Sequence, residues 1–205
     1  MAVVTITTKL DAVNRVLLAI GESPVSVLTG TLSSDAARAV AVLDEVDLDT
    51  QSRGWHFNTE YALYTPTANR ITVGASVVRF EVDTVRAGGA GDYTVRDSGG
   101  TMYLYDLVNN TFDITTSLYA TTVTLYDFEK TPEAYKRYVT IKAARTFVDR
   151  MTGDQARHIY TAQDEAAAFK QLKQFEGFHD TRTIFDGYSA ARPLLREYPR
   201  PFGSV

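Results

Sequence analysis

The stretch QSRGWHFNTEYALY, residues 51–64, marks the point where the hydrophobic period of the chain changes. Before it, apolar residues recur every three or four positions, as they do on a helix that buries one face. After Trp55, and as far as Lys130, the period is close to two and turn residues separate short segments. Gly54 is expected to end the last helix before this change. The sequence therefore predicts helices first and antiparallel strands next.

Two helices are predicted upstream of this boundary. Thr8 and Asp11 have the T-x-x-D spacing of a capping box, so the first helix is expected to begin there and to end at Gly21. The second is expected to begin near Ser34, with its acidic residues on a solvated face and Arg53 four residues beyond the last of them. The expected buried stripes are Leu10, Val13, Leu17 and Ile20, then Ala36, Ala39, Leu43 and Val46, and the expected solvated acids are Asp44, Glu45, Asp47 and Asp49.

The middle of the chain is predicted to form about six short antiparallel strands. Glycine and asparagine clusters between the alternating segments indicate hairpins or loops. Short strands at this spacing are typical of a small sandwich or barrel, and the pattern does not choose between the two. The expected strands are 57–64, 78–82, 93–96, 102–107, 111–114 and 122–126.

Helical periodicity returns at Thr131, whose hydroxyl is expected to cap a third helix with Pro132 at its first position. Gly153 interrupts the pattern, and Asp154 is expected to cap a fourth helix. Past Gly177 the periodicity fails. The expected buried stripes are Tyr138, Ile141, Ala144, Val148 and Met151, then Ile159, Ala162, Ala166, Phe169 and Leu172.

Neither helical pair can bury its apolar stripe alone, so the economical arrangement joins both pairs. The predicted fold class is α+β, with a four-helix bundle made from residues 1–54 and 131–176. An antiparallel β-sandwich or barrel, residues 55–130, is inserted between its halves. Residues 177–205 are predicted to form an extended C-terminal arm, because they are too rich in aromatic residues for an ordinary disordered tail.

Composition excludes several classes of protein. The chain has 205 residues, no cysteine, and 21 Lys and Arg against 25 Asp and Glu, which gives a net charge of −4. A disulfide scaffold and a thiolate metal site are therefore impossible, and constitutive nucleic-acid binding is disfavoured because counterion release needs clustered cations. The longest apolar run, 16–20, is too short to span a bilayer, so no membrane insertion is expected. The opening MAVVTITTKL lacks the features of a signal peptide, so synthesis in a reducing cytoplasm is expected.

No catalytic, cofactor-binding or metal-binding motif stands out. His56, His158 and His179 lack the spacing of a histidine-rich metal site. The glycines in 88–91 are not followed by the Lys and Ser or Thr of a P-loop, and 187–191 lacks the final glycine of a nucleophile elbow. We therefore expect no cofactor and no metal.

Carboxylates and tyrosines in the predicted β region leave one enzymatic hypothesis open. Tyrosines beside carboxylates can hold a sugar ring, and a pair of carboxylates about 5 to 9 Å apart is what glycoside hydrolysis requires. The simpler interpretation is that aspartates end strands and tyrosines fill cross-strand positions. The candidate glycan-facing residues are Asp92, Tyr93, Asp97, Tyr103, Tyr105 and Asp106.

Four stretches of the helical segments carry a family resemblance. They are AVNRVLLAIGESPVSVLTG (12–30), DAARAV (35–40), QSRGWHFNTE (51–60) and TPEAYKRYVTIKAARTFVDRMTGD (131–154). In this order they closely resemble the tail tubular protein A family, the head-to-tail adaptors of autographivirus-type short-tailed phages. The likeness covers most of residues 9–176.

The resemblance implies a structural role in the virion tail, with assembly in the host cytoplasm. Such proteins form a ring, usually of twelve copies, that joins the portal protein to the nozzle, tail tubular protein B, and helps to carry the tail fibres. DNA passes through the lumen without specific binding, and no cofactor or obligatory chemistry is implied. The alternative hypothesis is that the β region binds or hydrolyses host cell-surface polysaccharide.

Two parts of the chain are expected to contact partners. Residues 131–176 have 8 basic and 6 acidic residues, whereas residues 55–130 have 5 basic and 9 acidic residues. If any part of the chain faces DNA or an acidic portal surface, we therefore expect it to be residues 131–176. Aromatic residues and arginines in the arm suit an interface with the portal or a neighbouring copy. These interface candidates are Arg182, Tyr188, Arg192, Arg196, Tyr198, Arg200 and Phe202.

Overall fold

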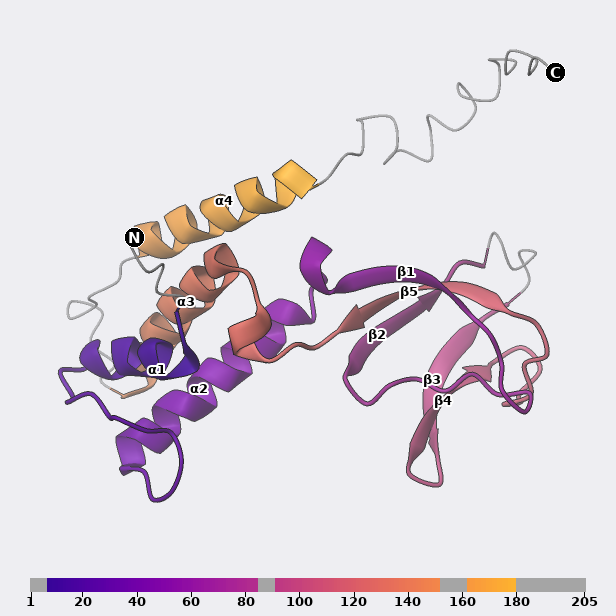
Figure 1. Cartoon of the computed structure of the whole chain (residues 1–205), viewed down its shortest axis with the longest axis horizontal. Helices are drawn as coiled ribbons and strands as arrows, with labels where there is room; N and C mark the ends of the chain where they lie inside the picture. Colours follow the sequence, from indigo (N-terminus) through magenta and orange to yellow (C-terminus); the bar gives the residue numbers. More distant parts are fainter. Residues whose placement is uncertain (1–6, 85–90, 152–161, 180–205) are drawn as a thin grey trace, which may run out of the picture.

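The computed structural model describes residues 7–84, 91–151 and 162–179. Within these ranges helices gather at one end of the molecule and strands at the other (Figure 1). The helices are α1 (Lys9–Leu18), α2 (Ser34–Gln51), α3 (Glu133–Met151) and α4 (Ala162–His179), with short 3-10 turns η1 (His56–Asn58) and η2 (Phe128–Lys130). The strands are β1 (Thr59–Tyr64), β2 (Val77–Val82), β3 (Tyr93–Ser98), β4 (Thr101–Asp106) and β5 (Leu118–Thr124).

All strand pairing in the described residues is antiparallel. One sheet has three strands in the order β1-β5-β2, and a second sheet is the β3-β4 hairpin. The mixed helical and antiparallel class predicted from the sequence is confirmed. The described strands form no closed barrel, which removes that alternative for this part of the chain.

The strand expected at 111–114 is wrong. Thr111 makes only an isolated bridge with Asp106, and Ile114 turns into a hydrophobic core. The cause is a tight turn: the Asp106 carboxylate accepts hydrogen bonds from the backbone N–H groups of Val108 and Asn109, which bends the chain where a strand needs it extended. The last strand also begins earlier than expected, at Leu118.

Two clusters of buried apolar side chains hold the molecule together. The larger one combines residues of α1 and α2 with residues of α3 and α4, so both helical segments of the sequence contribute to a single hydrophobic cluster. α3 contacts α1, α2 and α4. The smaller cluster lies among the strands and is formed by Ile71, Leu104, Ile114 and Leu118.

The helix starts follow the predicted signals more closely than the helix faces do. Thr8 and Asp11 form the expected capping box, and Ser33 caps α2. Met151, Ala162 and Ala166, expected inside, are exposed, and Ala168 is buried in place of Ala166. The run of small alanines in α4 gives no amphipathic signal of its own, so packing decides its phase. The predicted signals at Gly153, Asp154 and Ile159 lie outside the described residues.

No described helix combines the length and the apolar character needed to cross a membrane.

Candidate interaction surfaces

Gln51, at the end of α2, joins the helices to the strands. Its side-chain amide makes both hydrogen bonds that a neighbouring backbone would make: Nε2 donates to the Tyr126 carbonyl and Oε1 accepts from the Tyr126 N–H, each at 2.9 Å. Gln51 is only 1% exposed, so both amide atoms are satisfied away from bulk water. The chain that leaves β5 is thereby held against the end of α2.

Trp55 continues this junction into the helical core. Its indole Nε1 donates to the Thr50 carbonyl at 2.6 Å, and its ring packs edge-on against Tyr135 and Phe169. The Lys173 ammonium lies 5.0 Å from the centre of the indole ring. One side chain therefore contacts the last turn of α2 together with α3 and α4.

Asn58 closes the turn between α2 and β1. Its Oδ1 accepts from the Trp55 N–H at 2.7 Å, and its Nδ2 donates to the Gln51 carbonyl at 3.0 Å. The next backbone N–H, that of His56, donates to the Glu176 carboxylate of α4 at 2.8 Å. The stretch 51–58 is therefore an architectural junction, and each polar residue in it has a defined hydrogen-bond partner.

A second family-like stretch, IGESPV (20–25), has a similar role at α1. The Asn14 amide donates to the Val25 carbonyl at 2.9 Å and accepts from the Val25 N–H at 2.8 Å. Gly21 ends α1 with φ +83°, a conformation that favours glycine. The loop after α1 is thereby pinned to the helix it leaves.

Asp47 was expected on a solvated face, and that expectation is wrong. Its carboxylate accepts hydrogen bonds from the hydroxyl of Tyr135 at 2.8 Å and from Nε2 of Gln51. Burial raises the pKa of Asp47 above its usual value, although both hydrogen bonds act in the opposite direction. Burial also raises the pKa of the Tyr135 hydroxyl, and the neighbouring Asp47 charge adds to this shift. A charge pattern along one helix could not reveal that α3 packs over this position.

The variant Asp47→Asn is expected to become more stable relative to the wild-type chain as the pH rises through and above ~4. A carboxyl whose pKa is raised in the folded state favours folding less once it ionises, and asparagine does not ionise. Asp11 and Asp49, whose pKa values are lowered, are present in both proteins and cancel in the comparison. Urea denaturation of both proteins between about pH 3 and pH 7 measures the difference. A difference that does not change with pH would contradict the prediction.

The other acids of α2 form ion pairs with cations elsewhere in the chain. Asp44 pairs with Lys9 of α1 at 2.6 Å. The Glu45 carboxylate accepts hydrogen bonds from both terminal nitrogens of Arg150, at 2.6 and 2.7 Å. Asp49 binds Lys142 at 2.7 Å and also Arg53, the partner expected four residues beyond it. Each exposed pair contributes little stability. Together, however, they engage two of the five cations of α3, Lys142 and Arg150, that contribute to the basic surplus of residues 131–176.

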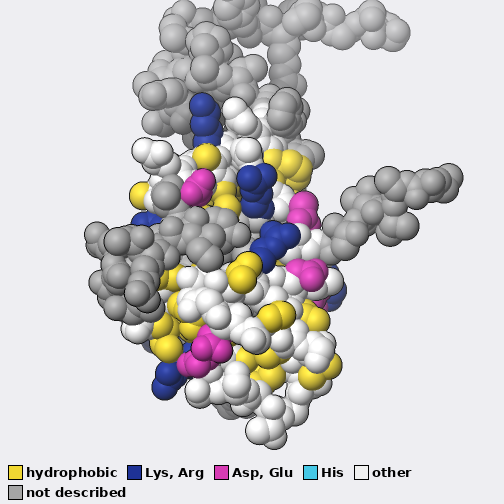
Figure 2. Space-filling view, turned by 90° about the vertical axis from the view of Figure 1, so that its left-hand side faces the viewer, with side chains coloured by type: hydrophobic (Ala, Val, Ile, Leu, Met, Phe, Trp, Pro, Cys, Tyr) yellow, Lys and Arg dark blue, Asp and Glu magenta, His cyan; other side chains and the backbone are white. Residues whose placement is uncertain are grey.

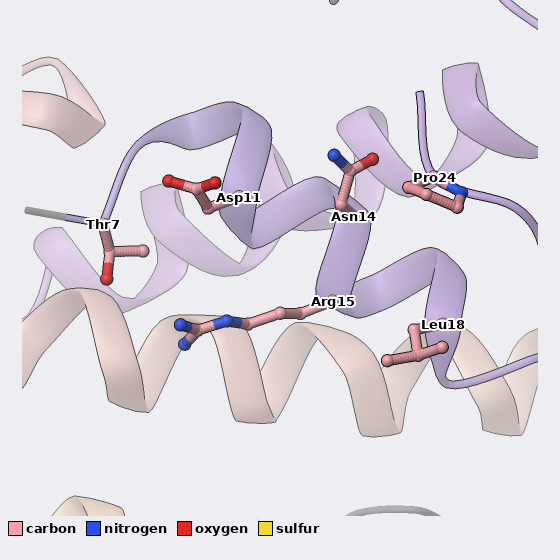
Figure 3. Close-up of a pocket in the computed structure, with 6 residues that line it drawn as sticks. All are labelled: Thr7, Asp11, Asn14, Arg15, Leu18 and Pro24. Carbon is pink, nitrogen blue, oxygen red and sulfur yellow. The ribbon is translucent and has the colours of Figure 1, made fainter. Parts of the chain in front are cut away.

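The helical end is hollowed beside α1. One hollow of about 410 Å³ is lined by Thr7, Asp11, Asn14, Arg15, Leu18 and Pro24, and Arg15 reaches from α1 towards the neighbouring helix (Figure 3). An adjoining hollow of about 490 Å³ shares Thr7 and Arg15 and adds Arg137 and Glu133 of α3. From this end Lys and Arg side chains are interspersed with Asp and Glu (Figure 2). Among the described residues there is no group of three or more metal-ligating side chains.

The structure separates the candidate glycan-facing residues. Asp92 and Asp97 lie at opposite ends of β3, five residues apart, or ~17 Å in an extended strand. Asp106 is held in the turn after β4 by the N–H groups of Val108 and Asn109 and by the Asn109 amide, and the backbone hydrogen bond from Asn109 is the main reason that its pKa is lowered. Burial raises the pKa of Tyr93, the cross-strand partner of Asp106. Asp97 therefore lies well away from Asp92 and, because Asp106 is the register partner of Tyr93, from Asp106 as well.

Tyr103 and Tyr105 lie on the other face of the hairpin, where residues absent from the predicted set surround them. The rings of both pack edge-on against Phe112, at 6.4 and 4.8 Å between ring centres. The guanidinium carbon of Arg96 lies 4.0 Å from the centre of the Tyr105 ring, and that of Arg70 lies 5.3 Å from the centre of Tyr103. The sequence held a signal for Arg96: a hairpin that turns at Gly99-Gly100 makes Arg96 the cross-strand partner of Tyr103. Nothing local places Arg70 or Phe112 there.

The seven interface candidates of the C-terminal arm lie outside the described residues. They are Arg182, Tyr188, Arg192, Arg196, Tyr198, Arg200 and Phe202.

Comparison with known proteins identifies the family of the chain. No curated protein matches the chain. The sequence model of the tail tubular protein family matches residues 10–181, which include every described helix and strand except the first residue of α1. The match covers most of the chain and contains both architectural motifs, IGESPV and QSRGWHFN. The protein therefore belongs to the tail tubular protein family, which gives it a structural role in a phage tail.

Proposed function

We propose that this protein is a head-to-tail adaptor of a short-tailed phage. In this proposal about twelve copies form a ring between the portal protein and the nozzle, tail tubular protein B, and the ring contributes to fibre attachment. The family match over residues 10–181 is the observation that carries the proposal. A closed ring requires each subunit to offer two different, complementary surfaces, and closure by rotation then sets the number of copies.

The contacts of the junction support a connecting role. Gln51 and Trp55 tie α2, α3, α4 and the chain after β5 to one another through buried hydrogen bonds and ring contacts. An adaptor that joins two different rings must transmit force between the surfaces that contact them. A buried, hydrogen-bonded junction between helices and strands is suited to transmitting such a force.

Charge supports a lumen past which DNA moves without strong binding. The net charge is −4, and Lys142, Arg145 and Arg150 of α3 are paired with acids of the same chain. Phosphate binding needs cations that are free to exchange their counterions, and these three are engaged. These three cations are therefore better explained as a complement to the acidic face of α2 and to Glu165 than as a DNA-binding surface.

Glycan hydrolysis has less support. The carboxylates proposed for it lie at opposite ends of β3 or are held within a turn. Asp92 and Asp97, ~17 Å apart along an extended strand, are too far apart for the carboxylate pair that glycoside hydrolysis requires, and Asp106 is engaged by the N–H groups of its own turn.

Ring formation is tested by native mass spectrometry and negative-stain images of the purified protein, alone and mixed with portal protein. Rings of about twelve subunits, at least in the presence of portal, are expected. A chain that stays monomeric with portal and is missing from purified virions would refute the proposal. A side assay for release of reducing sugars from host envelope polysaccharide, with Asp92→Asn and Asp97→Asn as controls, tests the enzymatic alternative.

A further inference from the structure

Five residues of the β region form a surface that the proposed function does not explain. Arg70, Arg96, Tyr103, Tyr105 and Phe112, here called the arginine–tyrosine surface, lie around the outward face of the β3-β4 hairpin. Leu104, between the two tyrosines in sequence, faces the opposite way and is fully buried in the core of the strands. The surface is therefore held on a packed sheet.

Arg70 is presented by a tight turn. Thr67 and Arg70 exchange both backbone hydrogen bonds, at 2.8 and 3.1 Å, and the two residues between them, Ala68 and Asn69, have positive φ of 51° and 60°. Positive φ is uncommon outside glycine and is unfavourable for alanine. The Asn69 carbonyl is fixed in turn by the N–H of Ile114 at 2.8 Å. Arg70 is therefore held close to Tyr103 and Phe112 before any partner arrives.

The two guanidinium groups have unused hydrogen-bonding capacity. Within the described residues neither Arg70 nor Arg96 forms an ion pair or a side-chain hydrogen bond; both are held only by aromatic rings. A guanidinium that lies over a ring directs its N–H donors outwards in its own plane, where they can grip a carboxylate. Arg96 also covers a face of Tyr105, so a sugar could stack there only by displacing it.

The surroundings favour a short acidic segment over a long polyanion. Residues 55–130 have 5 basic and 9 acidic residues, so DNA or an anionic polysaccharide would bring many charges close to aspartates as well as to the two arginines. A protein segment can place one or two carboxylates on the arginines and no further charge nearby. Arginine and tyrosine are also the residues that most often dominate binding energy at protein interfaces.

A second copy of this chain is a poor source of that acidic segment. The densest acidic face described, on α2, is already neutralised by Lys9, Lys142 and Arg150 of the same chain. We propose that the arginine–tyrosine surface docks an acidic segment of a different tail protein, with its carboxylates on Arg70 and Arg96. This inference rests on the proposed function, because it assumes that the chain is assembled in a tail.

Carbodiimide coupling in assembled particles tests the proposal. The reagent joins an amine to a carboxylate that touches it, so the variant Arg96→Lys keeps the positive charge and adds a reactive group. After treatment of purified virions, peptide mass spectrometry is expected to show position 96 joined to an Asp or Glu of a different tail protein. The neighbouring pair Lys130 and Asp127, 2.6 Å apart, reports that the coupling worked.

The outcomes separate the two proposals. Virions that lack the wild-type chain would refute the proposed function itself. Virions that contain the variant chain and couple Lys130 to Asp127, but show coupling of position 96 only to another copy or to nothing, would overturn the docking surface alone.

A loss-of-contact variant provides a second measurement. Arg70→Ala combined with Arg96→Ala is expected to lower the amount of the cross-linked partner on particles by roughly tenfold or more, because charge-assisted contacts are lost. The matched control, Arg38→Ala combined with Arg150→Ala, removes two exposed arginines that are paired with acids of α2 and should leave the amount unchanged. Circular dichroism of both double variants is the check that they fold. A loss equal to that of the control, or salt-sensitive binding of duplex DNA or heparin that disappears in the Arg70 and Arg96 double variant, would contradict an acidic protein partner.

Discussion

Replacing Trp55 with alanine is expected to lower the free energy of unfolding by about 3–5 kcal/mol, which makes it the most damaging single change considered for this protein. The indole is 4% exposed and packs against Tyr135 and Phe169, which belong to different helices. Its loss leaves a cavity at the junction and leaves the Thr50 carbonyl without its donor. Equilibrium urea denaturation followed by circular dichroism measures the change.

Trp55→Phe separates the two causes of that loss. Phenylalanine keeps one aromatic ring at the junction but loses the N–H that reaches Thr50 and part of the bulk of the indole, so a smaller loss of about 1–3 kcal/mol is expected. If Trp55→Ala were no more destabilising than Trp55→Phe, the ring contacts with α3 and α4 would not be what stabilises the junction. The same pair of variants tested for ring assembly would show whether the junction matters for the oligomer as well as for the subunit.

Gly54→Ala is expected to lower the free energy of unfolding by about 2–4 kcal/mol, from two independent causes. Gly54 has φ +78°, which an L-residue with a side chain adopts only with strain. In addition, an added Cβ would lie 2.6 Å from the Arg79 guanidinium and 3.1 Å from a methyl group of Val123. Arg79 can move aside, but Val123 is fully buried and cannot easily do so.

Gly21→Ala is the matched control for this prediction. Gly21 has nearly the same φ, +83°, and a Cβ there would have nothing within 4 Å. Its replacement should therefore cost only the backbone strain, about 1–2 kcal/mol. Chemical denaturation of both variants gives the difference, which isolates the close approach of the α2 end to β2 and β5. Equal losses would show that the contact with Val123 is relieved at no cost.

Local signals explain why the helices were located well. The capping box at Thr8, the cap at the start of α2 and the end of α1 near Gly21 each depend on residues within four positions of one another. The β3-β4 hairpin is local in the same sense, since the Gly99-Gly100 turn sets its register. Such features form wherever the chain folds, so the residues themselves reveal them.

The errors have a common cause. Asp47 is turned inwards because Tyr135, 88 positions later, donates to it. The phase of α4 is decided by which alanine fits against the neighbouring helices, and a run of alanines has no preference of its own. The strand expected at 111–114 is replaced by a turn that the Asp106 carboxylate stabilises. Hydrogen bonds from a side chain to the nearby backbone compete with strand formation, and the alternation of apolar residues gives no sign of them.

The candidate surfaces also combine residues that the local sequence places with residues that only tertiary packing places. The sequence contains the tyrosines of β4 and the register that brings Arg96 beside them, but Arg70 and Phe112 reach the same face only because the loops before β2 and after β4 pack there. The carboxylates considered for catalysis could be named from the sequence, whereas their separation along β3 needed the structure.

The sequence alone determined the helical and antiparallel segments, the absence of cysteine chemistry, and the family to which the chain belongs. The structural role of the family-like stretch 51–58, which joins the helices to the strands, was decided by the tertiary structure alone. Gln51 bonds to a backbone 75 positions away, and Trp55 packs on a helix more than a hundred positions further on. Secondary structure follows from neighbours a few residues apart, but the partner of a buried amide or indole is whichever distant group folding brings into reach, and no local pattern encodes that choice.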